Sequence, residues 1–182
     1  AESVFAEMSD FAKYAFNKSH AAAYAVVAFR TAYLKCHHRR EYMCALLNSV
    51  AGDNRRVDLY IDDLSRAGIR VLPPDVNESG EGFTVVGDNL RFGLAAVKNV
   101  GGAFAAFIVQ ERLANGPYTG FEDFLLRTQG RGNVRMIESL VNCGAMDGFG
   151  HPRSRMAAAA ESAVQTVAGM NNGVIAGQMG LF

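Results

Sequence analysis

The chain has 182 residues, of which 49% are hydrophobic, enough for one ordinary domain or two small ones with a buried core. No apolar run approaches the roughly 18 residues of a membrane span, and no secretion signal opens the chain, so we expect a cytoplasmic protein without a membrane partner. The 18 basic and 18 acidic residues cancel, which argues against a strongly basic nucleic-acid binder but permits local basic surfaces.

Two further features concern the origin of the chain. Its three cysteines, Cys36, Cys44 and Cys143, are odd in number and widely spaced, which favours reduced thiols in a cytosol. The chain opens with Ala1 rather than Met and enters a helical pattern at once. We therefore interpret it as a piece of a longer protein.

Apolar residues recur at helical spacing through the first third of the chain. Ser19 and Asp53 are suitable N-caps for the second and fourth of the predicted helices, and Gly68 follows the end of the fourth. The second helix is rich in alanine and apolar on most sides, so we expect it to be buried or flanked by other helices. The predicted helices cover residues 3–14, 19–36, 40–49 and 53–67.

The pattern then changes to short extended segments. Ile69–Leu72 is predicted to be extended and to end at Pro73-Pro74. A β-hairpin is predicted from strands at 83–86 and 90–92, with Gly87-Asp88-Asn89 as the turn. The polar stretch Asn77–Gly82 just before this hairpin is the predicted domain boundary.

The remainder is predicted to be helical in short pieces interrupted by glycine, followed by a flexible tail over 169–182, which has four glycines and two asparagines. The overall fold class is therefore an α-rich α+β chain with one small β-hairpin. The predicted helices are Ala103–Leu113, Phe121–Arg127, Val134–Asn142 and Arg153–Val167.

A polar cluster precedes the second helix. Asn17, Lys18, Ser19 and His20 lie at a helix N-terminus, where free N–H groups and the helix dipole favour an anion. Tyr24 lies one turn after His20 on the same face. The set could hold a triphosphate or a DNA phosphate and stack a base; the alternative is a solvated cap beside a buried tyrosine.

Two glycine-containing turns join short helices. In the first, Lys98, Asn99, Val100 and Gly101 lie between helical segments. In the second, Gly144 and Ala145 follow a helix, and another begins at Arg153. Glycine lets backbone N–H groups approach a phosphate, and such a contact positions DNA without reading its sequence. A single turn of this kind is more typical of two helices that simply pack together across a turn.

Metal sites are not favoured. Cys36-His37-His38 with Cys44 has ligand-type residues, but adjacent helical histidines diverge and no paired spacing supports zinc. Asp62-Asp63 also diverge and are interpreted as a solvated face. No catalytic residue is assigned.

Three stretches resemble the alpha subunits of bacterial replicative DNA polymerase III, the C-family DNA polymerases. The run Phe11–Leu47 is similar to their fingers, Gly68–Asn77 is similar to a Gly-Ile-x-Val-Leu-Pro-Pro-Asp-Val-Asn segment, and Leu90–Leu94 follows in order. Ala15 stands where the family usually has glycine, and Arg30 stands where it often has glutamine. The resemblance covers almost the whole chain.

The resemblance implies roles for the motifs. Residues 1–82 would be part of the fingers, in which Asn17, Lys18, Ser19, His20 and Tyr24 face the incoming deoxynucleoside triphosphate. Residues 83–168 would carry the hairpin and a tandem helix–hairpin–helix domain that grips duplex DNA. The predicted DNA-contact residues are Lys98, Asn99, Val100, Gly101, Gly144, Ala145 and Arg153.

The resemblance also implies partners and a missing active site. Gln178, Leu181 and Phe182, in the tail 169–182, resemble the peptide that binds the bacterial β sliding clamp. Other replisome subunits at the nucleoid would be neighbours. The aspartates that hold magnesium would lie in the palm, upstream of this stretch, so the fragment is expected to hold no cofactor and to be inactive alone.

Three alternatives stay open. A DNA-repair helix–hairpin–helix glycosylase would need a catalytic Lys or Asp soon after the hairpin, and Gly102–Phe107 supplies neither. An adaptor would use only the tail. An error-prone C-family homologue would generally lack the clamp peptide.

Overall fold

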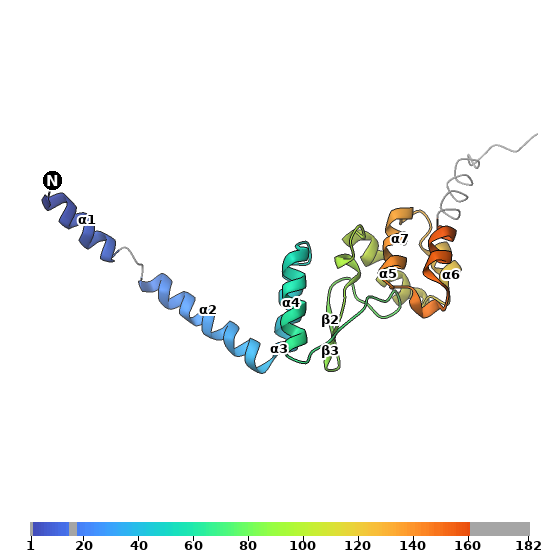
Figure 1. Ribbon diagram of the computed structural model, residues 1–182, viewed down its shortest axis with the longest axis horizontal. Coiled ribbons are helices and arrows are strands. Elements are labelled where there is room, and N and C mark those ends of the chain that lie inside the picture. The colour runs from blue at the N-terminus through green and yellow to red at the C-terminus, as the bar shows by residue number, and fades with distance from the viewer. Residues whose placement is uncertain (1, 15–17, 161–182) are drawn as a thin grey trace, which may run out of the picture. The chain divides into compact units, whose positions relative to one another are not determined.

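The computed structural model describes residues 2–14 and 18–160. The chain divides into two compact units, Ala1–Tyr42 and Met43–Phe182, and each is described by itself. Figure 1 identifies the helices and strands. Among the described residues, no helix combines the length and apolarity needed to cross a membrane.

The first unit is helical. Its elements are α1 (Glu2–Tyr14), α2 (Lys18–His37) and the start of α3 (Arg39–Ser49). Helix α2 begins at Lys18, so Ser19 lies in its first turn instead of capping it. No residue of α2 is buried, and the Tyr24 and Phe29 side chains are 63% and 70% exposed. The prediction that this helix is buried or flanked is thus wrong for the described part of this chain.

The second unit continues from α3 into α4 (Asn54–Arg66). Asp53 caps α4 as predicted, because its carboxylate accepts the N–H of Arg56 at 3.3 Å. Gly68 has φ +76°, the left-handed conformation expected just after a helix end. Capping residues and apolar periodicity are local signals, which is why the sequence places this helix within a residue of its observed ends.

A three-stranded sheet follows, made of β1 (Val71–Leu72), β2 (Thr84–Val86) and β3 (Asn89–Arg91) in the order β1-β3-β2. The predicted hairpin is present as the antiparallel pair β2–β3. Val86 pairs with Asn89, so the turn is Gly87-Asp88 and Asn89 belongs to the strand. The segment predicted only as extended is strand β1, which pairs in parallel with β3.

The predicted domain boundary falls inside the second unit, because the segment before the hairpin is held from several sides. Arg112 donates hydrogen bonds to the carbonyls of Val76 (2.7 Å) and Ser79 (3.0 Å). Ser79 is fully buried, and its hydroxyl donates to the carbonyl of Phe92 at 2.8 Å. The polar composition predicts a domain boundary here, and the structure shows that these hydrogen bonds tie the stretch to residues that follow the hairpin.

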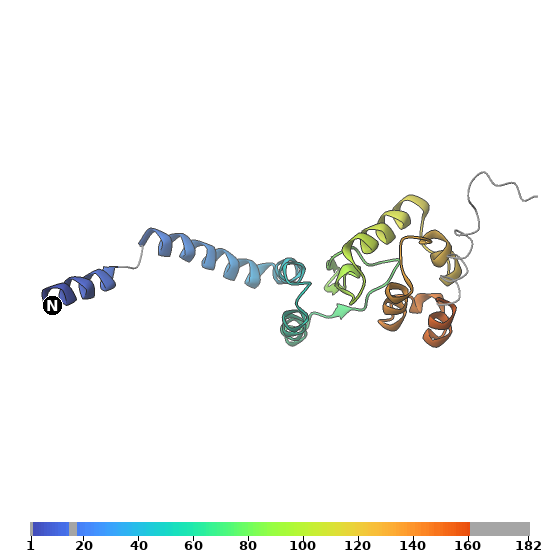
Figure 2. The same cartoon turned by 90° about the horizontal axis from the view of Figure 1, so that it is seen from above.

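The rest of the second unit is a cluster of short helices around one core, seen from two directions in Figures 1 and 2. The core runs from Val76 to Ala160 and includes the fully buried Phe124 and Leu140. Residues 153–160 are helical, whereas the remainder of the predicted helix 153–167 and the tail lie outside the described residues. The helices are η1 (Leu94–Ala96), α5 (Gly102–Asn115), α6 (Phe121–Arg127), α7 (Val134–Asn142) and η2 (Asp147–Phe149).

Candidate nucleic-acid interface

The first hairpin joins η1 to α5 and is anchored by two valines. The side chains of Val97 and Val100 are 7% and 3% exposed, and the N–H of Val100 donates to the carbonyl of Val97 at 3.0 Å. Lys98 and Asn99 form the exposed tip between them. The buried valines anchor the turn in the core and leave the Lys98 side chain exposed at the tip.

The unusual backbone conformation of this hairpin belongs to an asparagine. Asn99 has φ +68°, and it is the one non-glycine residue with positive φ in the part of the chain that the structure describes. Asparagine tolerates this region better than most residues. Gly101 has φ −73° and ψ 154°, a conformation open to any residue. The left-handed residue of this turn is therefore Asn99, and the backbone conformation of Gly101 does not require glycine.

Gly101 and the start of α5 present free backbone donors. Within the described residues, the N–H groups of Gly101, Gly102 and Ala103 have no hydrogen-bond acceptor. A Cβ atom added to Gly101 would meet no atom within 4 Å. Because α5 has 14 residues, its dipole adds to these donors at the N-terminus. The geometry suits an anion that approaches the backbone closely.

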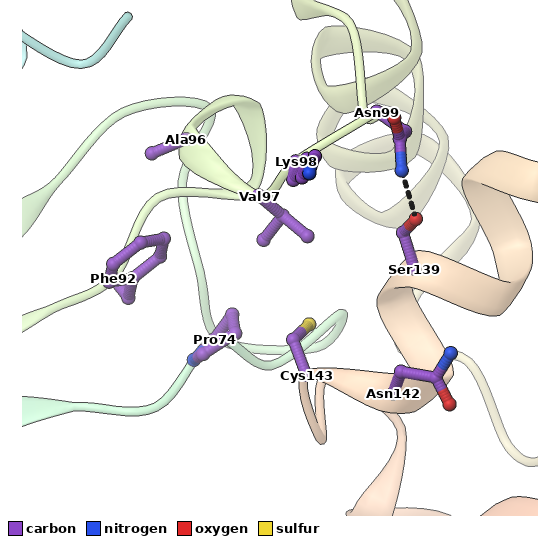
Figure 3. Close-up of a pocket in the computed structure, with 9 residues that line it drawn as sticks. All are labelled: Pro74, Phe92, Ala96, Val97, Lys98, Asn99, Ser139, Asn142 and Cys143. Carbon is purple, nitrogen blue, oxygen red and sulfur yellow. Dashed lines mark hydrogen bonds between the residues drawn. The ribbon is translucent and has the colours of Figure 1, made fainter. Parts of the chain in front are cut away.

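A groove lies beside this tip (Figure 3). It has a volume of about 500 Å³. Figure 3 shows Asn99 pointing to Ser139 on α7, and its side-chain amide donates to the Ser139 hydroxyl at 3.0 Å. The groove is lined by Pro74, Phe92, Ala96, Val97, Lys98, Asn99, Ser139, Asn142 and Cys143.

The second hairpin is closed by its own hydrogen bonds. The N–H of Gly144 donates to the carbonyl of Val141 and that of Ala145 to Leu140, each at 3.0 Å. Gly144 has φ +86°, so this pair is the usual left-handed end of a helix. The carbonyl of Ala145 accepts the N–H of Val76 at 2.9 Å. These groups have partners inside the chain, unlike the donors of the first hairpin.

Arg153 is held by the second hairpin. Its Nε donates to the Asp147 carboxylate at 2.8 Å, and its Nη1 donates to the carbonyl of Asn142 at 3.0 Å. The hydrogen bond from Arg153 holds the pKa of Asp147 below its ordinary value. Burial raises the pKa of the neighbouring Cys143 thiol. In this structure Arg153 therefore fixes the turn after α7 instead of reaching outward.

The predicted DNA-contact residues thus fall into two groups. Lys98, Asn99 and Gly101 are exposed together on the first hairpin, whereas Val100, Gly144 and Ala145 are buried and Arg153 is bound to Asp147. Sequence reasoning missed Ser139 and Asn142, which lie one turn apart at the end of α7 and line the groove. Their spacing of three on an amphipathic helix was the available signal.

The residues predicted to contact nucleotide lie in the first unit. Lys18, Ser19 and His20 occupy the first turn of α2. The His20 and Tyr24 rings are 4.3 Å apart between centroids, so the predicted shared face exists. Asn17 and the clamp-peptide residues Gln178, Leu181 and Phe182 lie outside the described residues.

Comparison with protein families identifies the module. Residues 68–156 match the family model described as a helix-hairpin-helix motif. The match includes both hairpins and the sheet that precedes them. The chain therefore contains a helix–hairpin–helix module.

Curated relatives give the particular family. The chain is 45% identical over 182 residues to DNA polymerase III subunit alpha of Saccharopolyspora erythraea. It is 44% identical over 173 residues to that of Mycobacterium tuberculosis and 45% identical over 183 residues to that of Thermus aquaticus. These matches cover 100%, 94% and 100% of this chain but 15% of each relative. The chain belongs to the family of DNA polymerase III alpha subunits and spans about 15% of the length of these relatives.

Proposed function

We propose that this segment holds duplex DNA by its phosphate backbone within a DNA polymerase III alpha subunit. The single observation that carries the proposal is the row of unpaired N–H groups at Gly101, Gly102 and Ala103. Lys98 adds a positive charge three residues before the row. Backbone donors and one lysine recognise a phosphate without reading bases.

The first hairpin is the main contact in this proposal. Its N–H donors have no acceptor among the described residues, whereas those of Gly144 and Ala145 already have acceptors. A second phosphate contact at Gly144, Ala145 or Arg153, as the sequence predicts, would require the existing hydrogen bonds of that hairpin to be exchanged. We therefore assign the second hairpin mainly to support, because it packs against the same core as the first.

The proposal is tested by adding a side chain at Gly101. The variant Gly101→Val fits the backbone conformation, and its Cβ atom would meet no other atom within 4 Å, so we expect the fold to be retained while phosphate approach is blocked. We expect at least a tenfold loss of affinity for a fluorescein-labelled duplex, measured by anisotropy with the intact chain. Gly120→Val is the matched control, because Gly120 is the N-cap of α6 and is equally open. Equal affinity of both variants and the unsubstituted chain would overturn the proposal.

A nucleotide contact on α2 is the second part of the proposal. The tilted His20–Tyr24 ring pair near Lys18 supports it, because aromatic rings and a cation at a helix N-terminus suit a base and its phosphates. Asn17 and Ser19 would add polar contacts. Nucleotide transfer itself would take place in the palm, where the magnesium ions of the whole polymerase would lie. Nucleotide titration of the Tyr24→Ala variant of the whole polymerase, with an expected rise in KM, tests this contact.

Clamp binding is the third part. Gln178, Leu181 and Phe182 support it through their spacing alone. A short peptide of this kind would place two apolar side chains in a pocket of the β sliding clamp and so keep the polymerase on DNA.

A further inference from the structure

The tip of the first hairpin is tied to α7 by a short chain of hydrogen bonds. The Asn99 amide donates to the Ser139 hydroxyl at 3.0 Å, and this hydroxyl donates in turn to the carbonyl of Arg135 at 2.8 Å. Figure 3 shows the Asn99–Ser139 contact at the edge of the groove. The Ser139 hydroxyl both accepts from Asn99 and donates to the helix backbone. The helix therefore fixes the orientation of this hydroxyl, and the hydroxyl in turn fixes the Asn99 side chain.

The tip of the first hairpin needs a contact that holds its conformation. Lys98 and Asn99 are both exposed, and the left-handed conformation of Asn99 costs energy for any residue other than glycine. Among the described residues, Ser139 is the one side chain that bonds to this tip. Without it, the turn would depend on the two buried valines and on the hydrogen bond between their backbones.

We infer that Asn99 and Ser139 are positioning residues that hold the first hairpin in the orientation in which Lys98 and the N–H row meet one phosphate. The inference rests on the proposed function of that hairpin. The inference extends that proposed function by assigning a role to α7. This helix, which precedes the second hairpin, sets the geometry of the first hairpin. A fixed geometry strengthens binding because less freedom is lost when DNA binds.

A direct contact of each residue with DNA is the competing account, and the two make different predictions. If Asn99 and Ser139 act as one unit, removing either partner lowers DNA affinity by the same factor. The double variant then binds DNA no more weakly than either single variant. If each contacts DNA separately, the two losses multiply. The variant Asn99→Gly is suitable because glycine adopts the same positive φ without strain, and Ser139→Ala is suitable because alanine is a good helix former.

The experiment measures duplex affinity and backbone mobility for the intact chain and three variants, namely Asn99→Gly, Ser139→Ala and the double variant. We expect about three- to tenfold weaker binding for each, the size of one hydrogen bond. In the absence of DNA, the NMR order parameters of residues 98–102 should fall in every variant and those of α6 should not. Ser65→Ala, an exposed serine of α4, is the control and should change neither readout.

Each outcome has one meaning. Unchanged order parameters in Ser139→Ala, unchanged affinity, or multiplicative losses would overturn the positioning role while leaving the proposed function intact. Failure of the unsubstituted chain to bind duplex would overturn the proposed function and the positioning role together. Equal losses in the single and double variants, with a more mobile tip, would support the inference.

Discussion

The carboxylate of Glu81 lies at the N-terminus of α5, beside Gly102. A Cβ atom added to Gly102 would be 3.5 Å from Oε1 of Glu81. The backbone of Glu81 is fixed there, because its carbonyl accepts the N–H of Ala95 at 2.9 Å. A negative charge therefore stands next to the row of donors that we assign to phosphate, where it stabilises the empty helix end and repels an incoming anion.

Removing this charge should strengthen DNA binding. We expect Glu81→Gln to bind duplex about two- to fivefold more tightly at low salt, since one repulsive carboxylate near the phosphate is lost. The gain should shrink as salt is added, because exposed charges are screened. Anisotropy titrations at two salt concentrations measure the duplex affinity of Glu81→Gln and of the unsubstituted chain. Glu122→Gln on α6 is the control. Weaker binding by Glu81→Gln would show that the carboxylate supports the site instead.

Close packing of the loop before α7 predicts a stability effect. A Cβ atom added to Gly132 would overlap the ring of Phe104, which is 3% exposed in the core. Gly132→Ala should therefore lower the free energy of unfolding by about 1–3 kcal/mol, as overpacking does. Gly52→Ala, where a Cβ atom meets nothing within 4 Å, should stay within about 0.5 kcal/mol of the unsubstituted chain. Urea denaturation of both compares them, and equal midpoints would contradict this packing.

A buried phenol predicts a loss of stability at high pH. Tyr118 is 2% exposed, its hydroxyl donates to the carbonyl of Ile108 at 3.0 Å, and burial raises its pKa from 10.0 to about 12. A raised pKa stabilises the fold fully below the unfolded value of 10.0 and loses that effect as pH rises to about 12. The stability difference between the unsubstituted chain and Tyr118→Phe should therefore shrink between these pH values.

Two measurements check the tyrosine. Denaturant unfolding at several alkaline pH values gives the stability difference, and absorbance near the phenolate band should show one late-ionising phenol that Tyr118→Phe removes. At neutral pH the variant should lose about 1 kcal/mol, the worth of a typical hydrogen bond. A pH-independent difference would mean that the phenol is not held in its protonated form by the fold.

Clamp binding predicts a separable loss. Full burial of Leu181 and Phe182 would supply roughly 3–6 kcal/mol, at about 1.5–3 kcal/mol each, before ordering costs. We therefore expect micromolar affinity for the bacterial β clamp. The double variant Leu181→Ala/Phe182→Ala should abolish it and leave duplex affinity unchanged. Calorimetry with Val174→Ala/Ile175→Ala as the matched control decides the matter; equal clamp affinity of the double variant would exclude this peptide as the tether.

Much of the fold was predictable from local signals. The ends of α6 and α7 agree with prediction because apolar periodicity and glycine neighbours set them. The pairing of β1 with β3 was missed because it joins segments about 20 residues apart and leaves no local signature. The burial of Ser79 was missed for the same reason, since its partner Phe92 is distant in the chain.

The candidate site was predictable in part. The sequence located the first hairpin, because a lysine and two glycines between helical segments are local. The sequence could not show that the N–H groups of Gly144 and Ala145 donate to carbonyls of α7, because these hydrogen bonds depend on how the helix ends. Nor could it assign the left-handed position to Asn99 or pair it with Ser139, which is 40 residues away.

Phosphate contact through the first hairpin predicts how the binding constant for duplex DNA depends on salt concentration. Neutralised phosphates release counterions, so the logarithm of the binding constant should fall linearly with the logarithm of salt concentration, by about 0.9 per contact. Lys98 lines the groove and is exposed. Replacing it removes one such contact without disturbing the core.

The decisive measurement is therefore the salt dependence of duplex binding for the intact chain and Lys98→Gln, on two duplexes of unrelated sequence. We predict a steep slope that is the same for both duplexes, and a slope smaller in magnitude by about one for Lys98→Gln. Binding that is independent of salt, that depends on DNA sequence, or that keeps its full salt slope after the Lys98 substitution would contradict phosphate contact through the first hairpin.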